Sequence, residues 1–180
     1  MNIHPHLLRP LERGRLRLRN RVVFPGHQTL FSDGGIVGDR MLAYYRERAR
    51  GGVGAVIVEG AAVHPTTVKF PQYLLAHDPS IVPSLARLAD ALHAHDCRVF
   101  LQLAHSGSRM NSQDARTPLW APSAVRSANS PEIPHAMTGA DIAELLDGYE
   151  AAARNVAATA GAGDGDGIDG VEIHAAHEYL

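Results

Sequence analysis

Two histidines and a tyrosine stand close together near residue 180, and their types suit stabilisation of a charged oxygen and transfer of a proton. His174 and His177 are three residues apart, Tyr179 follows two residues later, and an apolar stretch beginning at Gly170 leads into them. Neutral imidazole N–H groups stabilise negative charge on a carbonyl oxygen, and a phenol supplies a proton. In barrels of alternating strands and helices, chemistry sits at the C-terminal ends of the strands. The triplet is therefore the first candidate catalytic site.

Four short apolar segments predict the strands that would position such a site, over residues 21–24, 53–59, 98–103 and 170–174. The second and third are almost continuously apolar, as expected of strands buried on both faces. Polar and apolar residues alternate just ahead of the first strand, which predicts a small hairpin over about 14–20.

Amphipathic segments between the strands predict helices over 39–50, 79–95 and about 138–159. Asp39 is a candidate N-cap for the first, and Thr138, with a carboxylate three residues later, for the third. Strands alternating with helices favour a parallel sheet with right-handed crossovers. Two long loops, 60–79 and 104–137, follow strand ends, and loops of this length are often functional.

Two observations bear on whether the parallel sheet is open or closed into a barrel. No glycine-rich phosphate fingerprint follows the first strand, which counts against an open dinucleotide-binding sheet. Four strand–helix units fill the 180 residues, and an eight-unit barrel at this spacing would need about twice the length. The residues therefore predict an α/β fold with a parallel sheet, and the family resemblance given below implies the (β/α)8 TIM-barrel type, with 1–180 as one domain that forms the N-terminal half of the barrel.

Composition excludes several classes of partner and compartment. The net charge is −2, which gives no electrostatic case for nucleic acid or an anionic membrane surface. No apolar run approaches the roughly 20 residues of a membrane span, and no signal-peptide pattern opens the chain. A single cysteine, Cys97, allows no internal disulfide and is expected to pack in the core. These features predict a cytoplasmic protein without nucleic-acid or membrane partners.

Four motifs, in order and at consistent spacing, resemble the Old Yellow Enzyme family of FMN-dependent NADH:flavin oxidoreductases, whose fold is a (β/α)8 barrel. They are LRNRVVFP at 18–25, GVGAVIVEG at 52–60, LQLAHSG at 101–107 and DGVEIHAAH at 169–177 with Tyr179 and Leu180 after it. The pattern is most similar to the branch of 2,4-dienoyl-CoA reductase and trimethylamine dehydrogenase. Members of that branch carry an iron–sulfur cluster and further domains after the barrel, so the resemblance implies such a cluster only in a longer parent chain.

The resemblance implies a set of residues that contact FMN. Gly60 would let the flavin approach the second strand, and Gln102 would face the pyrimidine edge of the ring. The residues after the first strand would touch the isoalloxazine through their backbone: Pro25, Gly26, His27 and Gln28. Trimethylamine dehydrogenase has a flavin-linking cysteine near this point, whereas this chain has Gln28, so the FMN is expected to be non-covalent.

The resemblance also implies the substrate side of the site and its reductant. His174 and His177 would hold an oxygen of an activated alkene or enone-like substrate, and Tyr179 would donate a proton. NAD(P)H would reduce the flavin, and no metal ion is expected. Glu59 and Glu172, near strand ends, are expected to orient neighbouring groups rather than to react.

This sequence departs from the family pattern at two positions and carries only part of the family's cofactor site. Glu178 stands where the family has glycine, and Arg109 falls one place later than the arginine after the family's His-Ala-Gly, so its role is not carried over. The family's flavin-contacting arginine and phosphate site lie in the second half of the barrel. We therefore expect residues 1–180 alone to bind FMN weakly or not at all.

Two other functions stay open from the residues alone. A metal-dependent hydrolase could use His105, His174 and His177, although second-shell carboxylates are missing from the pattern. A catalytically incomplete half-barrel could act only by association, because its first and last strands would have open edges that pair with a second copy or with the other half. The alternating aspartates of 161–169 lack the bidentate glutamate of a calcium loop, so calcium is not expected there.

Overall fold

Four parallel strands form the centre of the molecule. The computed structural model describes residues 4–68, 70–128, 130–177 and 179–180. Strands β3 (Val23–Phe24), β4 (Ala55–Ala62), β6 (Arg98–Ala104) and β9 (Gly170–Ile173) lie side by side in that order. A short strand, β5 (Leu74–Leu75), also pairs with β4. Every pairing in this sheet is parallel, because each strand follows the previous one after a long crossover.

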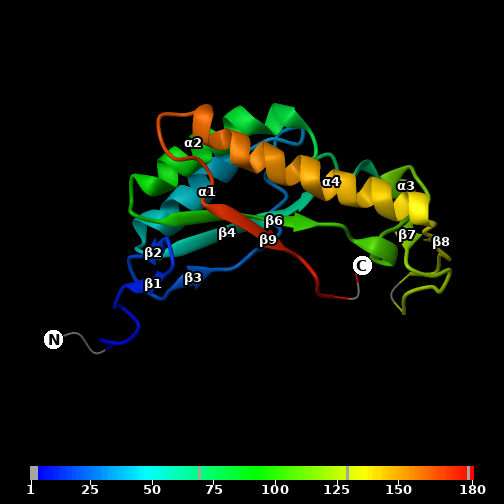
Figure 1. Cartoon of the computed structure of the whole chain (residues 1–180), viewed down its shortest axis with the longest axis horizontal. Helices are drawn as coiled ribbons and strands as arrows, with labels where there is room; N and C mark the ends of the chain where they lie inside the picture. The colour runs from blue at the N-terminus through cyan, green and yellow to red at the C-terminus, as the bar shows by residue number, and fades with distance from the viewer. Residues whose placement is uncertain (1–3, 69, 129, 178) are drawn as a thin grey trace.

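Three helices cover one side of this sheet (Figure 1). They are α1 (Asp39–Arg50), α2 (Val82–His93) and α4 (Gly139–Ala158). Three strand–helix units followed by a fourth strand match the first half of a (β/α)8 barrel, so the predicted fold class is confirmed. None of the helices in the described parts of the chain is long and apolar enough to cross a membrane.

The core lies between the helices and the helix-facing side of the strands. Val99, Leu101 and Leu103 of β6 are buried against a leucine stripe on α2. Because side chains alternate along a strand, Gln102 points to the opposite face, together with Glu172 of β9. That opposite face corresponds to the inside of a barrel, and it carries the candidate site.

Helix starts differ in part from the sequence prediction. Gly38, not Asp39, is the N-cap of α1, and Asp39 instead pairs with Arg87 at 2.9 Å. The second helix begins at Val82, because Pro79–Ile81 forms a separate 3₁₀ turn, η2. For α4, Thr138 is the N-cap, and its side chain and that of Asp141 form a reciprocal capping box.

The structure moves the predicted hairpin and fills the two predicted loops with short elements. Strands β1 (Leu11–Arg13) and β2 (Leu16–Leu18) turn at Gly14, whose φ of 57° suits glycine, so the predicted range 14–20 holds only the second strand. The sequence prediction missed the first strand because it is short and charged. The elements in the loops include η1 (Pro65–Thr67), η3 (Gly107–Arg109), α3 (Ser112–Ala115), β7 (Trp120–Ala121) and β8 (His135–Ala136), and a further short turn, η4 (Thr159–Gly161), follows α4.

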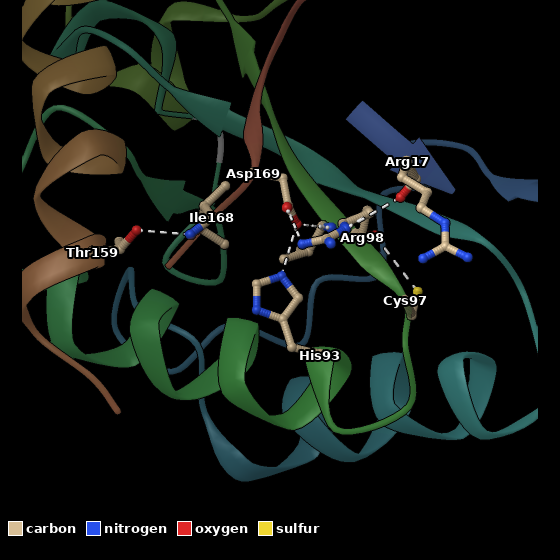
Figure 2. Close-up of polar contacts among 8 residues, drawn as sticks. Arg17, His93, Cys97, Arg98, Thr159, Ile168 and Asp169 are labelled. Carbon is tan, nitrogen blue, oxygen red and sulfur yellow. Dashed lines mark hydrogen bonds and ion pairs between the residues drawn. The ribbon is translucent and has the colours of Figure 1, made fainter. Parts of the chain in front are cut away.

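A polar cluster at the N-terminal end of the strands fixes the position of β9 relative to its neighbours (Figure 2). Asp169, next to β9, accepts hydrogen bonds from His93 at 2.8 Å, Arg98 at 3.0 Å and the Val99 N–H at 2.8 Å. Burial works to raise the pKa of Asp169, but these hydrogen bonds and the charges of His93 and Arg98 outweigh it and hold the pKa below its usual value. The carboxylate therefore ties β9 to both β6 and α2.

Replacing Asp169 by asparagine should lower the free energy of unfolding by about 2–4 kcal/mol, since His93 and Arg98 lose a buried anionic partner. Because the folded pKa is depressed, the contribution of the aspartate is present at neutral pH and is lost as the pH falls through that folded pKa. Urea unfolding at several pH values measures both effects. Asp166→Asn, an exposed aspartate in the same turn, is the matched control, and equal losses in the two variants would contradict this role.

Candidate active site

Residues from neighbouring strands form one row across the inner face of the sheet. Gly60 of β4 is in register with Gln102 of β6, which is in register with Glu172 of β9. The Gln102 side-chain N–H donates to a Glu172 carboxylate oxygen at 2.6 Å. Gly26, just after β3, lies against the same Gln102 amide. The structure therefore brings three predicted cofactor residues, Gly26, Gly60 and Gln102, to one place.

The two glycines let the backbone lie close to the Gln102 amide. A Cβ on Gly26 would lie 2.8 Å from Gln102 Nε2, and one on Gly60 would lie 3.2 Å from Gln102 Oε1 and 3.3 Å from Tyr73 Oη. A larger residue at either position would displace the Gln102 amide from this place. The result is a surface of two glycines beside one side chain, Gln102, which offers both a hydrogen-bond donor and an acceptor. A planar ring with an edge of alternating N–H and C=O groups, such as a flavin, fits this donor set.

The loop after β3 is held by a buried carboxylate. Glu59 is fully buried and accepts hydrogen bonds from the Gln28 amide at 3.0 Å, from the Thr29 N–H at 2.8 Å and from the Thr29 hydroxyl. The Glu59 N–H donates to the Tyr45 hydroxyl at 2.9 Å. Burial raises the pKa of Glu59, although the hydrogen bonds from Thr29 oppose it. Glu59 thus orients its neighbours, as expected from the sequence, and sequence reasoning had not connected it with Gln28.

The remaining residues predicted on this loop are exposed. Pro25 and His27 lie on either side of Gly26, with their side chains accessible. Gln28 is also exposed, but its side-chain nitrogen is used by Glu59, so its contribution to a cofactor would come from other atoms. The loop is therefore fixed through Gln28 and Thr29 while Pro25 and His27 face outward.

The predicted substrate residues form a compact cluster beyond the end of β9. His174 Nε2 and His177 Nδ1 lie 3.2 Å apart, and the ring of Tyr179 is 4.9 Å from that of His174 and 5.6 Å from that of His177. His177 has a φ of 62°, a backbone conformation that turns its ring back toward His174. At this distance one ring nitrogen donates to the other, so an oxygen bound by both rings would have to replace this contact. The sequence prediction that these side chains gather at one strand end agrees with this geometry.

A second set of histidines, missed as a unit by sequence reasoning, lies beneath this cluster. His64 follows β4 and His105 follows β6, and Thr66 Oγ1 is 2.8 Å from His64 Nδ1 and 2.9 Å from His105 Nε2. His64 Nε2 is 3.0 Å from a carboxylate oxygen of Glu144 on α4. The signal was available in the sequence, because both histidines come directly after adjacent strands.

One backbone group fixes the direction of this hydrogen-bond chain. The Gly107 N–H donates to His105 Nδ1 at 3.1 Å, so the proton of the neutral ring sits on Nε2 and points to Thr66. Thr66 then donates to His64, and His64 donates to Glu144. Burial, helped by nearby His64, lowers the pKa of His105 to about 4. These hydrogen bonds therefore hold His105 as a neutral imidazole in a supporting role.

The hydrogen bonds that run from Glu144 to His105 are linked to Tyr179, the predicted proton donor, through Gly107. Gly107 has a φ of 55°, and a Cβ there would collide with the carbonyl oxygen of Tyr179. The chain from Glu144 to His105 thus holds the surface on which the Tyr179 segment lies. The side chain of His105 hydrogen-bonds with Thr66 and Gly107, whereas His174 and His177 form a separate pair. Within the described residues, no group of three or more His, Cys, Asp or Glu could hold a metal ion.

Comparison with known proteins identifies the family. The model of the NADH:flavin oxidoreductase / NADH oxidase family matches residues 6–180. The chain belongs to this family. An Old Yellow Enzyme homologue from Zymomonas mobilis has a similar structure, with a TM-score of 0.81 and 27% identity over 98% of this chain and 50% of its own. The resemblance noted in the sequence is therefore confirmed.

Curated relatives of this chain include reductases, a dehydrogenase and an NADH oxidase. A metal reductase of Desulforamulus reducens is 34% identical over 174 residues, and NADH:acrylate oxidoreductase of Vibrio harveyi is 34% identical over 170 residues. The matches cover 97% and 92% of this chain but only 25% and 16% of those proteins. The chain thus spans about a quarter or less of the length of these relatives, and it corresponds to part of such an oxidoreductase.

Replacing Glu59 by alanine should destabilise the protein by about 2–3 kcal/mol and loosen the β3–α1 loop, because Thr29 and Tyr45 lose buried partners. Urea unfolding measures the first effect, and hydrogen exchange of the amides of 27–31 measures the second. Glu12→Ala removes an exposed carboxylate and serves as the control. Unchanged exchange in this loop would show that Glu59 does not hold it.

Lowering the pH should destabilise the protein through His105. Its folded pKa of about 4 lies below the ordinary value of 6.5, so protons bind the unfolded chain first and stability falls as the pH drops between these values. From pH 7 to pH 5 this costs about 2 kcal/mol of unfolding free energy. His105→Asn keeps an acceptor for Gly107 and should remove this part of the pH dependence, whereas the exposed His6→Asn should retain it. Identical pH profiles for wild type and His105→Asn would refute the assignment.

Proposed function

We propose that this chain forms the FMN- and substrate-contacting half of an NAD(P)H oxidoreductase that reduces activated alkenes. The observation that carries the proposal is the convergence of His174 Nε2 and His177 Nδ1, 3.2 Å apart, with Tyr179 beside both rings. His174, the first residue of this cluster, comes two residues after Glu172, and Glu172 lies in the same row as Gln102. Both halves of the predicted site therefore belong to the same end of the sheet.

The side chains of this cluster suit reduction of an alkene conjugated to a carbonyl group. His174 and His177 would donate hydrogen bonds to the carbonyl oxygen, where negative charge develops as the double bond is reduced. Tyr179 would give its phenolic proton to the carbon next to the carbonyl. When bound, FMN would supply the hydride, a chemistry that no amino-acid side chain offers. Holding these groups in one register is the task of β6 and β9.

The cofactor contacts proposed for this chain are backbone groups and one side-chain amide. Gly26 and Gly60 would leave room for the ring, Gln102 would bind its pyrimidine edge, and the loop residues Pro25, His27 and Gln28 would contribute backbone. The FMN would be non-covalent and NAD(P)H its reductant. An iron–sulfur cluster would belong only to a longer parent chain.

The name of one relative supports the choice of substrate, and the chemistry of Cys97 bears on the proposed compartment. Acrylate, named for the Vibrio harveyi relative, is an alkene conjugated to a carboxylate. Burial raises the pKa of Cys97 to about 12, which keeps this thiol unreactive. A protein that draws on NAD(P)H and has one inert thiol suits the cytoplasm.

Association with another polypeptide is a second proposed role. A hollow of about 350 Å³ lies between α4 and β9, and the side chains of Leu146 and Ile173 there are 62% and 65% exposed. In a closed barrel, the next strand–helix unit lies against this side of the fourth strand. A second half-barrel, or a second copy of this chain, would bury these residues.

Titrating the purified 180-residue chain with FMN tests the cofactor assignment. We expect weak binding, with chemical-shift changes in ¹⁵N spectra centred on Gly26, Gly60 and Gln102. Gln102→Ala should weaken binding at least about tenfold, because it removes the donor and acceptor of the row. Gln113→Ala, on the exposed helix α3, is the control. Shift changes confined to other surfaces would refute the site, and size-exclusion mass in the same samples reports association.

In the FMN-loaded protein, Tyr179→Phe should slow oxidation of the reduced flavin by 2-cyclohexenone by about 10²-fold, since the proton donor is gone. Stopped-flow absorbance separates this step from reduction by NADH, which should slow far less. Tyr44→Phe, on α1, is the control. Equal effects on both steps would argue against a proton-donating role for Tyr179.

A further inference from the structure

In the row of Gly60, Gln102 and Glu172, Gln102 offers both a donor and an acceptor, and the neighbouring carboxylate of Glu172 holds it. Glu172 is its direct partner across the parallel pair of β6 and β9, on the same face of the sheet. The distance of 2.6 Å from Gln102 Nε2 to Glu172 Oε1 is that of a charge-assisted hydrogen bond. Both side chains are partly buried, so this bond is sheltered from water.

The chemistry of the pair fixes which end of the amide faces where. A carboxylate only accepts hydrogen bonds, so the nitrogen of Gln102 must face Glu172, and its oxygen must face away. The glycine contacts agree with this orientation, because the nitrogen lies beside Gly26 and the oxygen beside Gly60. The reversed amide would set its oxygen against the carboxylate and lose the strong bond.

From this arrangement we propose that Glu172 is a positioning residue, which locks the Gln102 amide in one orientation for the pyrimidine edge of a bound flavin. The inference rests on the proposed function. With the amide locked, Gln102 presents its oxygen as acceptor and its second N–H as donor in a fixed order. A ring edge with complementary N–H and C=O groups then binds in one register without ordering the side chain first.

The negative charge of Glu172 gives the pair a second effect. The carboxylate lies one hydrogen bond away from the amide that would contact the ring. A nearby negative charge makes the addition of electrons to a flavin less favourable. Glu172 should therefore lower the reduction potential of the bound flavin and so strengthen it as a hydride donor.

The orientation can be tested without any cofactor, by NMR of the side-chain amide of Gln102 in the chain as it stands. The two Nε2 protons, identified by their loss in Gln102→Leu, should be widely separated, with the bonded proton far downfield. Glu172→Gln keeps the shape but removes the obligatory acceptor, and it should collapse that separation. Glu172→Asp should retain part of it, and the exposed Glu150→Gln should leave it unchanged. Signals of Gln102 that do not respond to Glu172→Gln would overturn the proposal.

The effect on the cofactor is measured with FMN in the same variants. Glu172→Gln should weaken FMN binding about tenfold and shift the reduction potential of the bound FMN to more positive values, whereas Glu150→Gln should do neither. If wild type binds FMN and Glu172→Gln binds it with the same affinity and the same reduction potential, the positioning role is refuted. If wild type does not bind FMN at all, the proposed function fails, and the amide spectra alone decide whether Glu172 orients Gln102.

Discussion

The candidate site depends on one irregularity, the β-bulge in β4 between Val58 and Gly60. Before it, Val58 is paired with Leu101, and after it Gly60 is paired with Gln102, so Glu59 has no partner on β6. In a regular ladder, Glu59 would stand opposite Gln102 on the inner face and Gly60 would turn toward the helices. The extra residue thus replaces a carboxylate by a glycine at the point where a ring must approach.

The bulge also accounts for the position of the loop after β3. The Glu59 N–H, displaced from the ladder, is satisfied by the Tyr45 hydroxyl, and its carboxylate turns to Gln28 and Thr29. Burial and the charge of Glu59 both raise the pKa of Tyr45, so its hydroxyl stays protonated. One bulge residue therefore joins α1, β4 and the β3 loop. Together with the Asp169 cluster at the other end of the strands, Glu59 fixes where the elements that contribute to the row lie along the strand direction.

The sequence predicted most of the strand order and the cluster of His174, His177 and Tyr179, because apolar runs and strand-end polar residues are local signals. It could not predict the bulge, which exists only in the pairing of β4 with β6. It placed the hairpin late, because the charged strand Leu11–Arg13 has no apolar pattern. It did not consider His64 and named His105 only as a possible metal ligand, because His105 and Glu144, which complete this set of hydrogen bonds, lie far from His64 in the sequence.

Burial separates the histidines that support the site from those that would act in it. His105 is 1% exposed and bonded at both nitrogens, and its low pKa leaves no proton to give near neutral pH. His177 is exposed and shares its Nδ1 contact only with another imidazole that a substrate oxygen can replace. The first arrangement is costly to disturb and therefore holds Gly107 in place. The second is open to exchange, and a hydrogen bond that can be exchanged for one to a ligand is what a binding site requires.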